Sequence, residues 1–421
     1  MGDAFDGEVE RFLDALPGVM QAAGNGHVAR ARAWRRALWD AGLAGFGIPE
    51  EYGGRSEPAD GARRLQRLSK GRVPHEEGTF GIGLNMAVPT ILQYGSEELK
   101  KRFVPAALRG DEIWCQLYSE PGAGSDLPSL TTRAVPDGDE WVVNGQKVWN
   151  TSAHHADLGM FLARTDWDAP KHEGITYFVL PMRQPGVEVR PLRQANHHSS
   201  FNEVFLTDAR IPRGWVVGET NRGWAAALAT LAHERSFAVL GRTDFRNIAA
   251  GRALDELREE AAESARVYSW YPQRAGRADL AVPHAREAGR EGDPTVRQEL
   301  ARLHSLQRIG QWTAERATAA RRLGRPPGAE GSIGKLALSN LARQANRVHT
   351  LLSGANGMLA GGDPDARMDG VIAEILISTP AQSIAGGTDE VQRNILGEKF
   401  LGLPKEPDPA KGLPYREARN R

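Results

Sequence analysis

The spacing of hydrophobic residues changes twice along the chain, and the three resulting regions predict three structural units. From Val9 to about Gly110, apolar residues recur at intervals of three and four, as in FLDALPGVMQAA and ARAWRRALWDAGLAGFG. Glycine and proline interrupt this pattern at IPEEYGG. We therefore expect a helical unit that ends with LKKRFVPAALRG.

The second region, from Trp114 to about Gly218, is rich in β-branched and aromatic residues, which favour strands. In EWVVNGQKVW, the Asn144-Gly145 pair lies between two such segments and predicts a hairpin turn. The segments GITYFVLP and NEVFLTD continue the strand pattern. A compact β-domain is expected here.

Helical spacing returns in the third region, where Arg222 to about Glu263 predicts one long helix. A polar loop, AVPHAREAGREGDP, leads to two further helices, TVRQELARLHSLQRIGQWTAERATAARRL and KLALSNLARQANRVHTLLSG, which together predict an antiparallel bundle. The end of the chain, PKEPDPAKGLPYREARNR, predicts a weakly ordered tail. The expected units are residues 1–113, 114–218 and 219–403, followed by the tail at 404–421.

Composition and charge narrow the possible partners. Of 421 residues, 53 are Lys or Arg and 53 are Asp or Glu, so no net charge draws the chain to nucleic acid or to an anionic membrane. No uncharged apolar run approaches the roughly 20 residues of a membrane helix. With Cys115 as the single cysteine and an acidic start, MGDAFDGEVE, neither an intrachain disulfide nor a signal peptide is expected. We expect a cytoplasmic protein.

Two segments of the β-region carry candidate chemistry. In YSEPGAGSD (118–126), glycines allow the backbone to approach a ligand and to direct N–H groups at an anion, although such a segment alone is more often an ordinary turn. In QKVWNTS, Trp149 and Thr151 are two positions apart and therefore lie on one side of a strand. A flat indole and a hydroxyl donor suit a flavin ring, although a core tryptophan beside a surface threonine is commoner.

The order of four segments resembles the acyl-CoA dehydrogenase family: YSEPGAGSD, NGQKVWNTS, FNEVFLTDARIPRGWVVGETNRGW and GGTDEVQRNILGEKFLGLP. The resemblance implies an α+β fold with an N-terminal helical domain, a middle β-barrel or sandwich domain and a C-terminal four-helix bundle. It also implies FAD at a subunit interface, an acyl-CoA substrate and an electron-transfer flavoprotein as partner. A homotetramer is expected, with a heterotetramer as the alternative.

The resemblance also assigns site residues. Those implied to bind FAD are Gln116, Tyr118, Ser119, Gly124, Ser125, Trp149, Asn150, Thr151, Gly354, Thr388 and Glu390. Thr151 matches a threonine whose hydroxyl meets flavin N5, and Gly354 matches a loop that takes the adenine half of FAD from the adjoining subunit. Ser125, Arg235 and Gly386 are implied to contact the substrate. The family's Arg-x-x-Phe-Gly stretch is absent and is replaced by the loop around AVPHAREAGREGDP.

The reaction implied is α,β-desaturation, in which a base removes the α-proton and flavin N5 accepts the β-hydride. The best-known members carry a glutamate before the Gly-Thr pair, where this chain has Gly386. In LAHERSFAVLG, Glu234 shares a helix face with the uncharged Ala227 and Thr230, which predicts that it points into a buried region or a cleft. Isovaleryl-CoA and long-chain acyl-CoA dehydrogenases take their base from this helix, and Glu234 and Arg235 match their glutamate and arginine.

Other interpretations remain. Glu234 could pair with an arginine and do no chemistry, and His233, about 100° around the helix, is a rival base. The chain could be a flavin monooxygenase of the same fold or a non-catalytic subunit of a heteromeric enzyme. His197 and His198 are adjacent histidines without further ligands at metal-binding spacing, so we predict no metal site.

Overall fold

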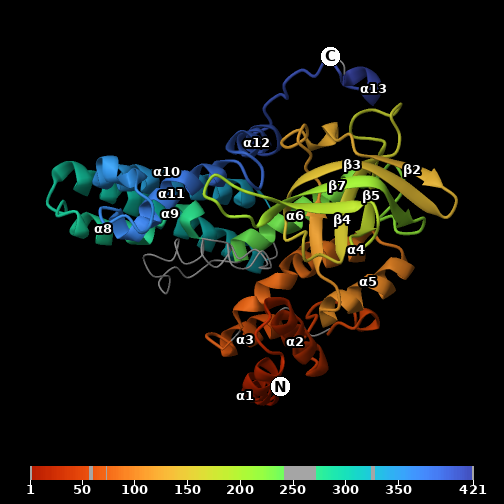
Figure 1. Cartoon of the computed structure of the whole chain (residues 1–421), viewed down its shortest axis with the longest axis horizontal. Helices are drawn as coiled ribbons and strands as arrows, with labels where there is room; N and C mark the ends of the chain where they lie inside the picture. The colour runs from red at the N-terminus through yellow and green to blue at the C-terminus, as the bar shows by residue number, and fades with distance from the viewer. Residues whose placement is uncertain (1, 56–59, 73, 241–271, 324–327, 420–421) are drawn as a thin grey trace.

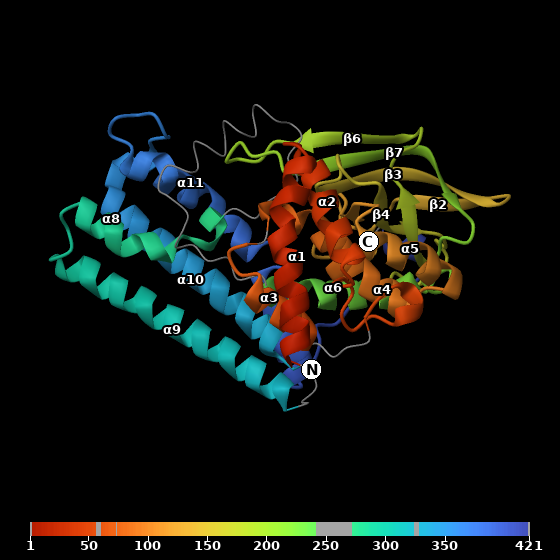
Figure 2. The same cartoon turned by 90° about the horizontal axis from the view of Figure 1, so that it is seen from below.

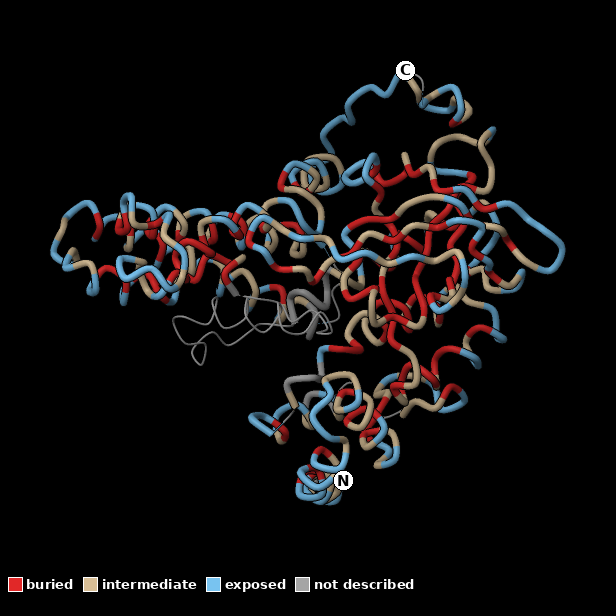
Figure 3. The backbone as a smooth tube through the Cα atoms, viewed as in Figure 1, coloured by how far each residue is buried: buried red, intermediate tan, exposed pale blue. Residues whose placement is uncertain are grey.

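The computed structural model describes residues 2–55, 60–72, 74–240, 272–323 and 328–419. Figure 1 shows three units: the N-terminal helices and the β-sheet lie one above the other, and the C-terminal helices extend to one side. Figure 3 shows the buried backbone concentrated in the sheet and where the helices meet it. In the described residues, no helix has the length and apolar character needed to cross a membrane.

The predicted N-terminal helical unit is confirmed. Its helices are α1 (Gly2–Ala22), α2 (His27–Asp40), α3 (Asp60–Leu68), α4 (Val88–Tyr94) and α5 (Glu97–Arg109). Helix α5 begins where the Ser96 hydroxyl accepts a bond from the Leu99 amide and ends at Gly110, whose φ is +80°. Phe103 of α5 packs edge-on against Trp114 and Trp215, which joins this unit to the sheet in one core.

The middle unit is one curved, seven-stranded sheet, a half-barrel. Its strands are β1 (Trp114–Leu117), β2 (Arg133–Asp137), β3 (Glu140–Thr151), β4 (Leu158–Arg164), β5 (Ile175–Pro181), β6 (Val187–Leu192) and β7 (Phe201–Pro212). They follow the order β1-β4-β2-β3-β7-β6, and β5 pairs with β4. The sheet therefore places β3 between β2 and β7, near the middle of the domain.

The hairpin predicted at Asn144-Gly145 is wrong, because β3 runs through both residues. The Asn144 amide instead bonds Asp208 across the sheet, and a β-carbon at position 145 would overlap with Thr132. The actual turn joins β2 to β3, where Asp137 pairs with Glu140 and Gly138 adopts a φ of +58°. The two turn residues are therefore Gly138 and Asp139, and glycine at the first central position is also a hairpin signal.

The third unit contains the two long helices that the sequence predicts. Its helices are α6 (Gly223–Leu240), α8 (Ala281–Glu287), α9 (Pro294–Arg322), α10 (Glu330–Ser353), α11 (Val371–Ser378) and α12 (Asp389–Ile395). Figure 2 shows α9 and α10 lying side by side along their length. The long helix predicted for 222–263 is described only as α6, and its remaining residues lie outside the described residues.

Two predictions for the C-terminal region are wrong. The polar loop predicted at 281–294 contains α8, because Ala281, His284 and Ala285 pack into the helical core. The tail predicted to be weakly ordered returns to the sheet and ends in α13 (Tyr415–Ala418), seen at the top of Figure 1. There Tyr415 is only 2% exposed.

Candidate functional site

Trp149 projects from the sheet because β3 is irregular at this point. The register between β3 and β7 shifts between Lys147 and Asn150, and Trp149 has a φ of +62°. Its side chain is 55% exposed and packs edge-on against Phe201, whereas Asn150 beside it is buried. A bulge that exposes a large aromatic side chain at the expense of backbone strain is typical of a functional site. Thr151, the next predicted residue, is half-buried.

A side-chain hydrogen bond connects β3 to β1 at the residue after Trp149. Asn150 Nδ2 donates to the carbonyl oxygen of Gln116 at 2.7 Å. Among the described residues, Gln116 Nε2 and Asn150 Oδ1 are buried without a hydrogen-bond partner. Because a buried polar group without a partner is costly, this donor and this acceptor indicate a ligand that offers both an acceptor and a donor.

The loop after β1 is held by a buried ion pair. Lys147 Nζ lies 2.8 Å from Glu120 Oε1 and 3.0 Å from the carbonyl oxygen of Tyr118, with both charged side chains almost fully buried. Burial alone would raise the pKa of Glu120, but Lys147 and hydrogen bonds from Thr131 and Thr132 lower it to about 2. The base of the loop is thus fixed.

The predicted loop residues differ in exposure. Tyr118 is buried, Ser119 is half-buried, and Gly124 and Ser125 are exposed. The exposed pair is therefore available to a ligand while the loop's base stays anchored.

Glu234 is half-buried on α6, at the junction of the three units. One turn earlier, the buried Thr230 hydroxyl lies 2.9 Å from the hydroxyl of Thr90 and 3.3 Å from that of Tyr177. Burial raises the pKa of Tyr118 well above its usual value, and the Glu234 carboxylate adds to this increase.

The neighbouring His233 is half-buried as well, and burial lowers its pKa. Its Nε2 atom is buried without a hydrogen-bond partner in the part of the chain that the structure describes. The side chain of Arg235 lies outside the described residues.

Asp389, the first residue of α12, anchors the start of this helix and the segment before it. This buried carboxylate lies 2.7 Å from Lys335 Nζ and 2.6 Å from an Arg343 nitrogen. The Thr388 hydroxyl oxygen caps α12 by accepting from the Val391 amide, so its own proton remains for donation. Glu390 is exposed and pairs with Arg393.

Gly386 stands just before this segment, with a φ of +68°, and none of the described heavy atoms lies within 4 Å of where its β-carbon would be.

One predicted site residue lies apart from the others. Gly354 ends α10, and Figures 1 and 2 both show this end of α10 at the far side of the helical unit from the sheet. A single chain therefore does not bring Gly354 to Trp149.

Several residues of the site were not selected from the sequence. Lys147 and Glu120 lie within the two segments of candidate chemistry, and a lysine in an apolar strand pattern is a signal for a buried pair. The sequence considers His198 only as a possible metal ligand, but its Nε2 lies 2.8 Å from Glu374 Oε1 of α11, and both side chains are buried. Within the described ranges, no group of three or more His, Cys, Asp or Glu residues could hold a metal ion.

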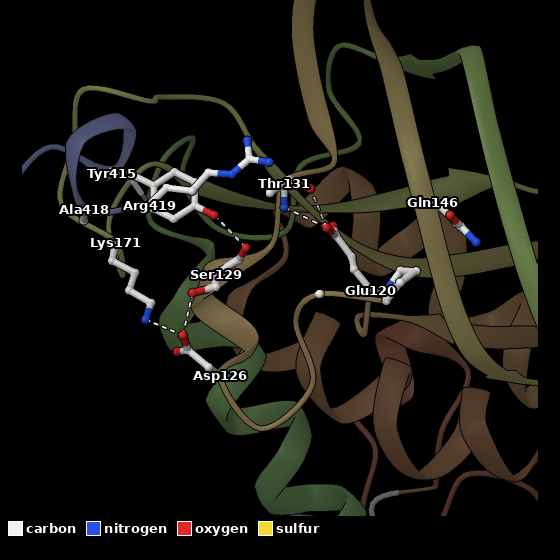
Figure 4. Close-up of a pocket in the computed structure, with 11 residues that line it drawn as sticks. Glu120, Asp126, Ser129, Thr131, Gln146, Lys171, Tyr415, Ala418 and Arg419 are labelled. Carbon is white, nitrogen blue, oxygen red and sulfur yellow. Dashed lines mark hydrogen bonds and ion pairs between the residues drawn. The ribbon is translucent and has the colours of Figure 1, made fainter. Parts of the chain in front are cut away.

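A cavity of about 630 Å³ lies between the loop after β1 and the C-terminal tail. Figure 4 shows Tyr415, Arg419, Lys171 and Asp126 on one side of it and Glu120 and Gln146 on the other. Lys171 reaches from the β4–β5 connection to the Asp126 carboxylate.

Each of the three units matches a domain of one known protein family. Models of the N-terminal, middle and C-terminal domains of acyl-CoA dehydrogenase match residues 3–111, 115–209 and 273–401. The chain is 36% identical to the acyl-CoA dehydrogenase IpdE1 of Mycobacterium tuberculosis over 382 residues, covering 89% of this chain and 88% of that protein.

Two solved structures have similar folds. The Tcur3481-Tcur3483 steroid ACAD is 27% identical with a TM-score of 0.68, covering 96% of this chain and 98% of that chain. The ChsE4-ChsE5 complex of Mycobacterium tuberculosis is 26% identical with a TM-score of 0.67, covering the same shares.

Proposed function

Because the chain belongs to the acyl-CoA dehydrogenase family of oxidoreductases, whose members generally use FAD, we propose that it desaturates an acyl-CoA thioester with Glu234 as the base. The observation that supports this most is the position of Glu234 on α6: it is half-buried, one turn after Thr230, whose hydroxyl contacts Tyr177, which in turn packs against Tyr118 of the loop. Gly386 has no side chain that could accept a proton. Electrons then pass to an electron-transfer flavoprotein.

The residues of the site fit a flavin. The unpartnered Gln116 amide can donate to a ring carbonyl and the unpartnered Asn150 oxygen can accept from a ring N–H, as the pyrimidine edge of isoalloxazine requires. Trp149 offers an exposed flat face, and Thr151 offers a hydroxyl. When bound, FAD supplies the hydride acceptor, so the protein has to supply position and a proton acceptor.

The protein's own contribution is to hold that acceptor in place. Thr230 anchors α6 to Thr90 and Tyr177, which fixes the helix turn from which Glu234 extends. Tyr118 packs against Tyr177 on the same side of the junction and is a neutral, buried neighbour. Glu234 can then take the α-proton while the exposed loop at Gly124 and Ser125 holds the remote part of the thioester.

The test is reduction of the bound flavin. We expect the purified protein to be yellow, and a suitable acyl-CoA to bleach its absorbance without oxygen. Because one similar structure is a steroid ACAD, steroid acyl-CoA thioesters belong in the panel with short, branched and long acyl chains. A protein that takes up no FAD, or a flavin that no thioester bleaches, contradicts the proposal.

Thr151→Val is expected to weaken FAD binding about fivefold, the usual net value of one hydrogen bond of about 1 kcal/mol. Valine preserves the shape of the half-buried side chain and removes the hydroxyl, so the fold should be unchanged. Titration of the apoprotein with FAD measures the effect, and Thr207→Val, at an exposed position of β7, is the matched control. Equal FAD affinity in both variants would contradict the role of Thr151.

We also propose that the site is completed by a second chain, because Gly354 lies at the far end of α10 from the sheet. A tetramer of identical chains is expected by sedimentation, since closed symmetric assemblies are usual when each subunit completes another. The alternative is a heteromer, which the two-protein complexes among the similar structures favour. Co-purification of a second homologous chain would support the heteromer, and a flavin-bound monomer would contradict both.

A further inference from the structure

We propose that the C-terminal segment 414–419 is a clasp that holds the ligand loop, defined as residues 118–131, in its binding position, with Tyr415 as the positioning residue. This inference rests on the proposed function only for its effect on CoA binding. The supporting contacts involve the tail, Arg164, the ligand loop itself and the β4–β5 connection.

Arg164 is the centre of this arrangement. Its side chain is fully buried, and its guanidinium donates to the carbonyl oxygens of Pro128 at 2.6 Å, Lys171 at 3.1 Å and Glu173 at 3.0 Å. A fourth, longer bond reaches Leu130 at 3.4 Å. One cation thus ties the ligand loop to the β4–β5 connection.

Tyr415 covers this cation. The guanidinium carbon of Arg164 lies 3.7 Å from the centre of the Tyr415 ring, a cation–π contact shielded from water. The Tyr415 hydroxyl donates to the carbonyl oxygen of Ser129 at 2.6 Å, as Figure 4 shows. Tyr415 therefore contacts the ligand loop directly and also through Arg164.

The tail is held there by its backbone. The Tyr415 amide donates to the Ala169 carbonyl at 2.9 Å, and the Arg416 amide donates to the Trp167 carbonyl at 3.1 Å. The Trp167 ring packs beside that of Tyr415. These bonds fix α13 against the β4–β5 connection.

Removing the ring has a predictable local consequence. Without Tyr415, water reaches the Arg164 guanidinium and competes with the loop carbonyls for its N–H groups. The ligand loop then loses part of its support on one side, while the Glu120–Lys147 pair still holds its base. The exposed Gly124 and Ser125 should become less ordered, and Glu234 on α6 should be unaffected.

The experiment compares three FAD-loaded variants with the parent protein. Tyr415→Leu removes the ring, Tyr415→Phe keeps it, and Glu417→Ala alters an exposed position of the same helix as a control. Hydrogen exchange is measured in peptides covering 121–131 and 165–174. Calorimetry measures the Kd for free coenzyme A, and steady-state kinetics with the best thioester of the panel gives kcat and KM.

In Tyr415→Leu, hydrogen exchange should become faster in the peptides covering 121–131 and 165–174 and stay unchanged in the sheet and in α6. The Kd for coenzyme A and the KM should both rise roughly tenfold, while kcat should stay within about threefold of the parent. This is the pattern expected when binding to substrate and transition state is lost equally. Tyr415→Phe should retain most of the parental exchange protection and coenzyme A affinity, and Glu417→Ala should match the parent in both measurements. If Tyr415→Leu does not fold, a chain ending at Leu413 replaces it with the same expectation.

Unchanged exchange in 121–131, or faster exchange over the whole protein, overturns the clasp. Changed exchange with an unchanged coenzyme A Kd overturns its role in binding. An inactive parent protein would instead count against the proposed function, and the exchange measurement would still decide whether the clasp exists.

Discussion

Glu234→Gln is expected to lower the rate of flavin reduction roughly 10²- to 10⁴-fold, the usual effect of removing a general base. Glutamine keeps the shape and the hydrogen-bonding capacity of the side chain but cannot accept the α-proton. FAD and acyl-CoA affinities should stay close to those of the parent protein, so the loss should appear in kcat and not in binding. Anaerobic stopped-flow measurement of flavin bleaching at increasing acyl-CoA concentration separates the rate of the chemical step from the binding affinity.

The controls identify the base. Glu315→Gln, at an exposed position of α9, should reduce flavin at the parental rate. His233→Gln should also retain most of the rate, because the rival base lies on another side of α6. A slow His233→Gln together with a fast Glu234→Gln would transfer the role to His233. Near-parental turnover in both single variants would leave the proposed mechanism without its base.

A second-site change extends this test. Gly386 has open space for a side chain, so adding Gly386→Glu to Glu234→Gln is expected to restore part of the activity. The φ of +68° at this position is unfavourable for a residue with a β-carbon and costs about 1–2 kcal/mol. We therefore expect partial recovery of flavin reduction with a lower unfolding midpoint. A double variant as slow as Glu234→Gln would indicate that the two positions do not serve one α-carbon.

Lys147→Met is expected to lower the free energy of unfolding by about 3–5 kcal/mol, because it leaves the Glu120 carboxylate buried without its cation. Denaturant titration measures the change. Arg190→Met breaks the exposed pair with Glu188 and is the matched control, with an expected loss of under about 1 kcal/mol. Similar losses in the two variants would show that the buried pair is no more important than a surface one.

The Glu120–Lys147 pair also predicts how the free energy of unfolding depends on pH. The pKa of Glu120 falls from 4.5 to about 2 on folding, so its stabilisation is fully present above about pH 4.5 and is lost as the pH falls towards 2. This contribution is about 3 kcal/mol, and the lowered pKa of the buried Lys147 offsets part of it. In Lys147→Met, burial raises the pKa of Glu120 without a cation to lower it, so the loss of stability between about pH 4.5 and 2 should become smaller or disappear. An unchanged acid profile would contradict the assignment.

Part of the site could be predicted from the sequence. The family motifs select Gln116 and Asn150, and the structure gives both of them buried, unpartnered amide atoms. The uncharged helix face around Glu234 predicts that it points into a buried region or a cleft, and in the structure its side chain is half-buried. The prominence of Trp149 could not be predicted, since the bulge arises from the register of β3 against β7.

The sequence by itself determined the long elements, because helix periodicity and β-branched composition are local properties that any packing has to satisfy. It did not determine which turn signal is used. Asn144 and Gly145 became part of β3 through its pairing with β7, and Gly138-Asp139 makes the turn. Only the tertiary structure decided the Glu120–Lys147 pair and the burial of Tyr415 over Arg164. Both bring together residues from separate segments, and the cost of leaving a buried charge without a partner becomes visible only when the sheet is assembled.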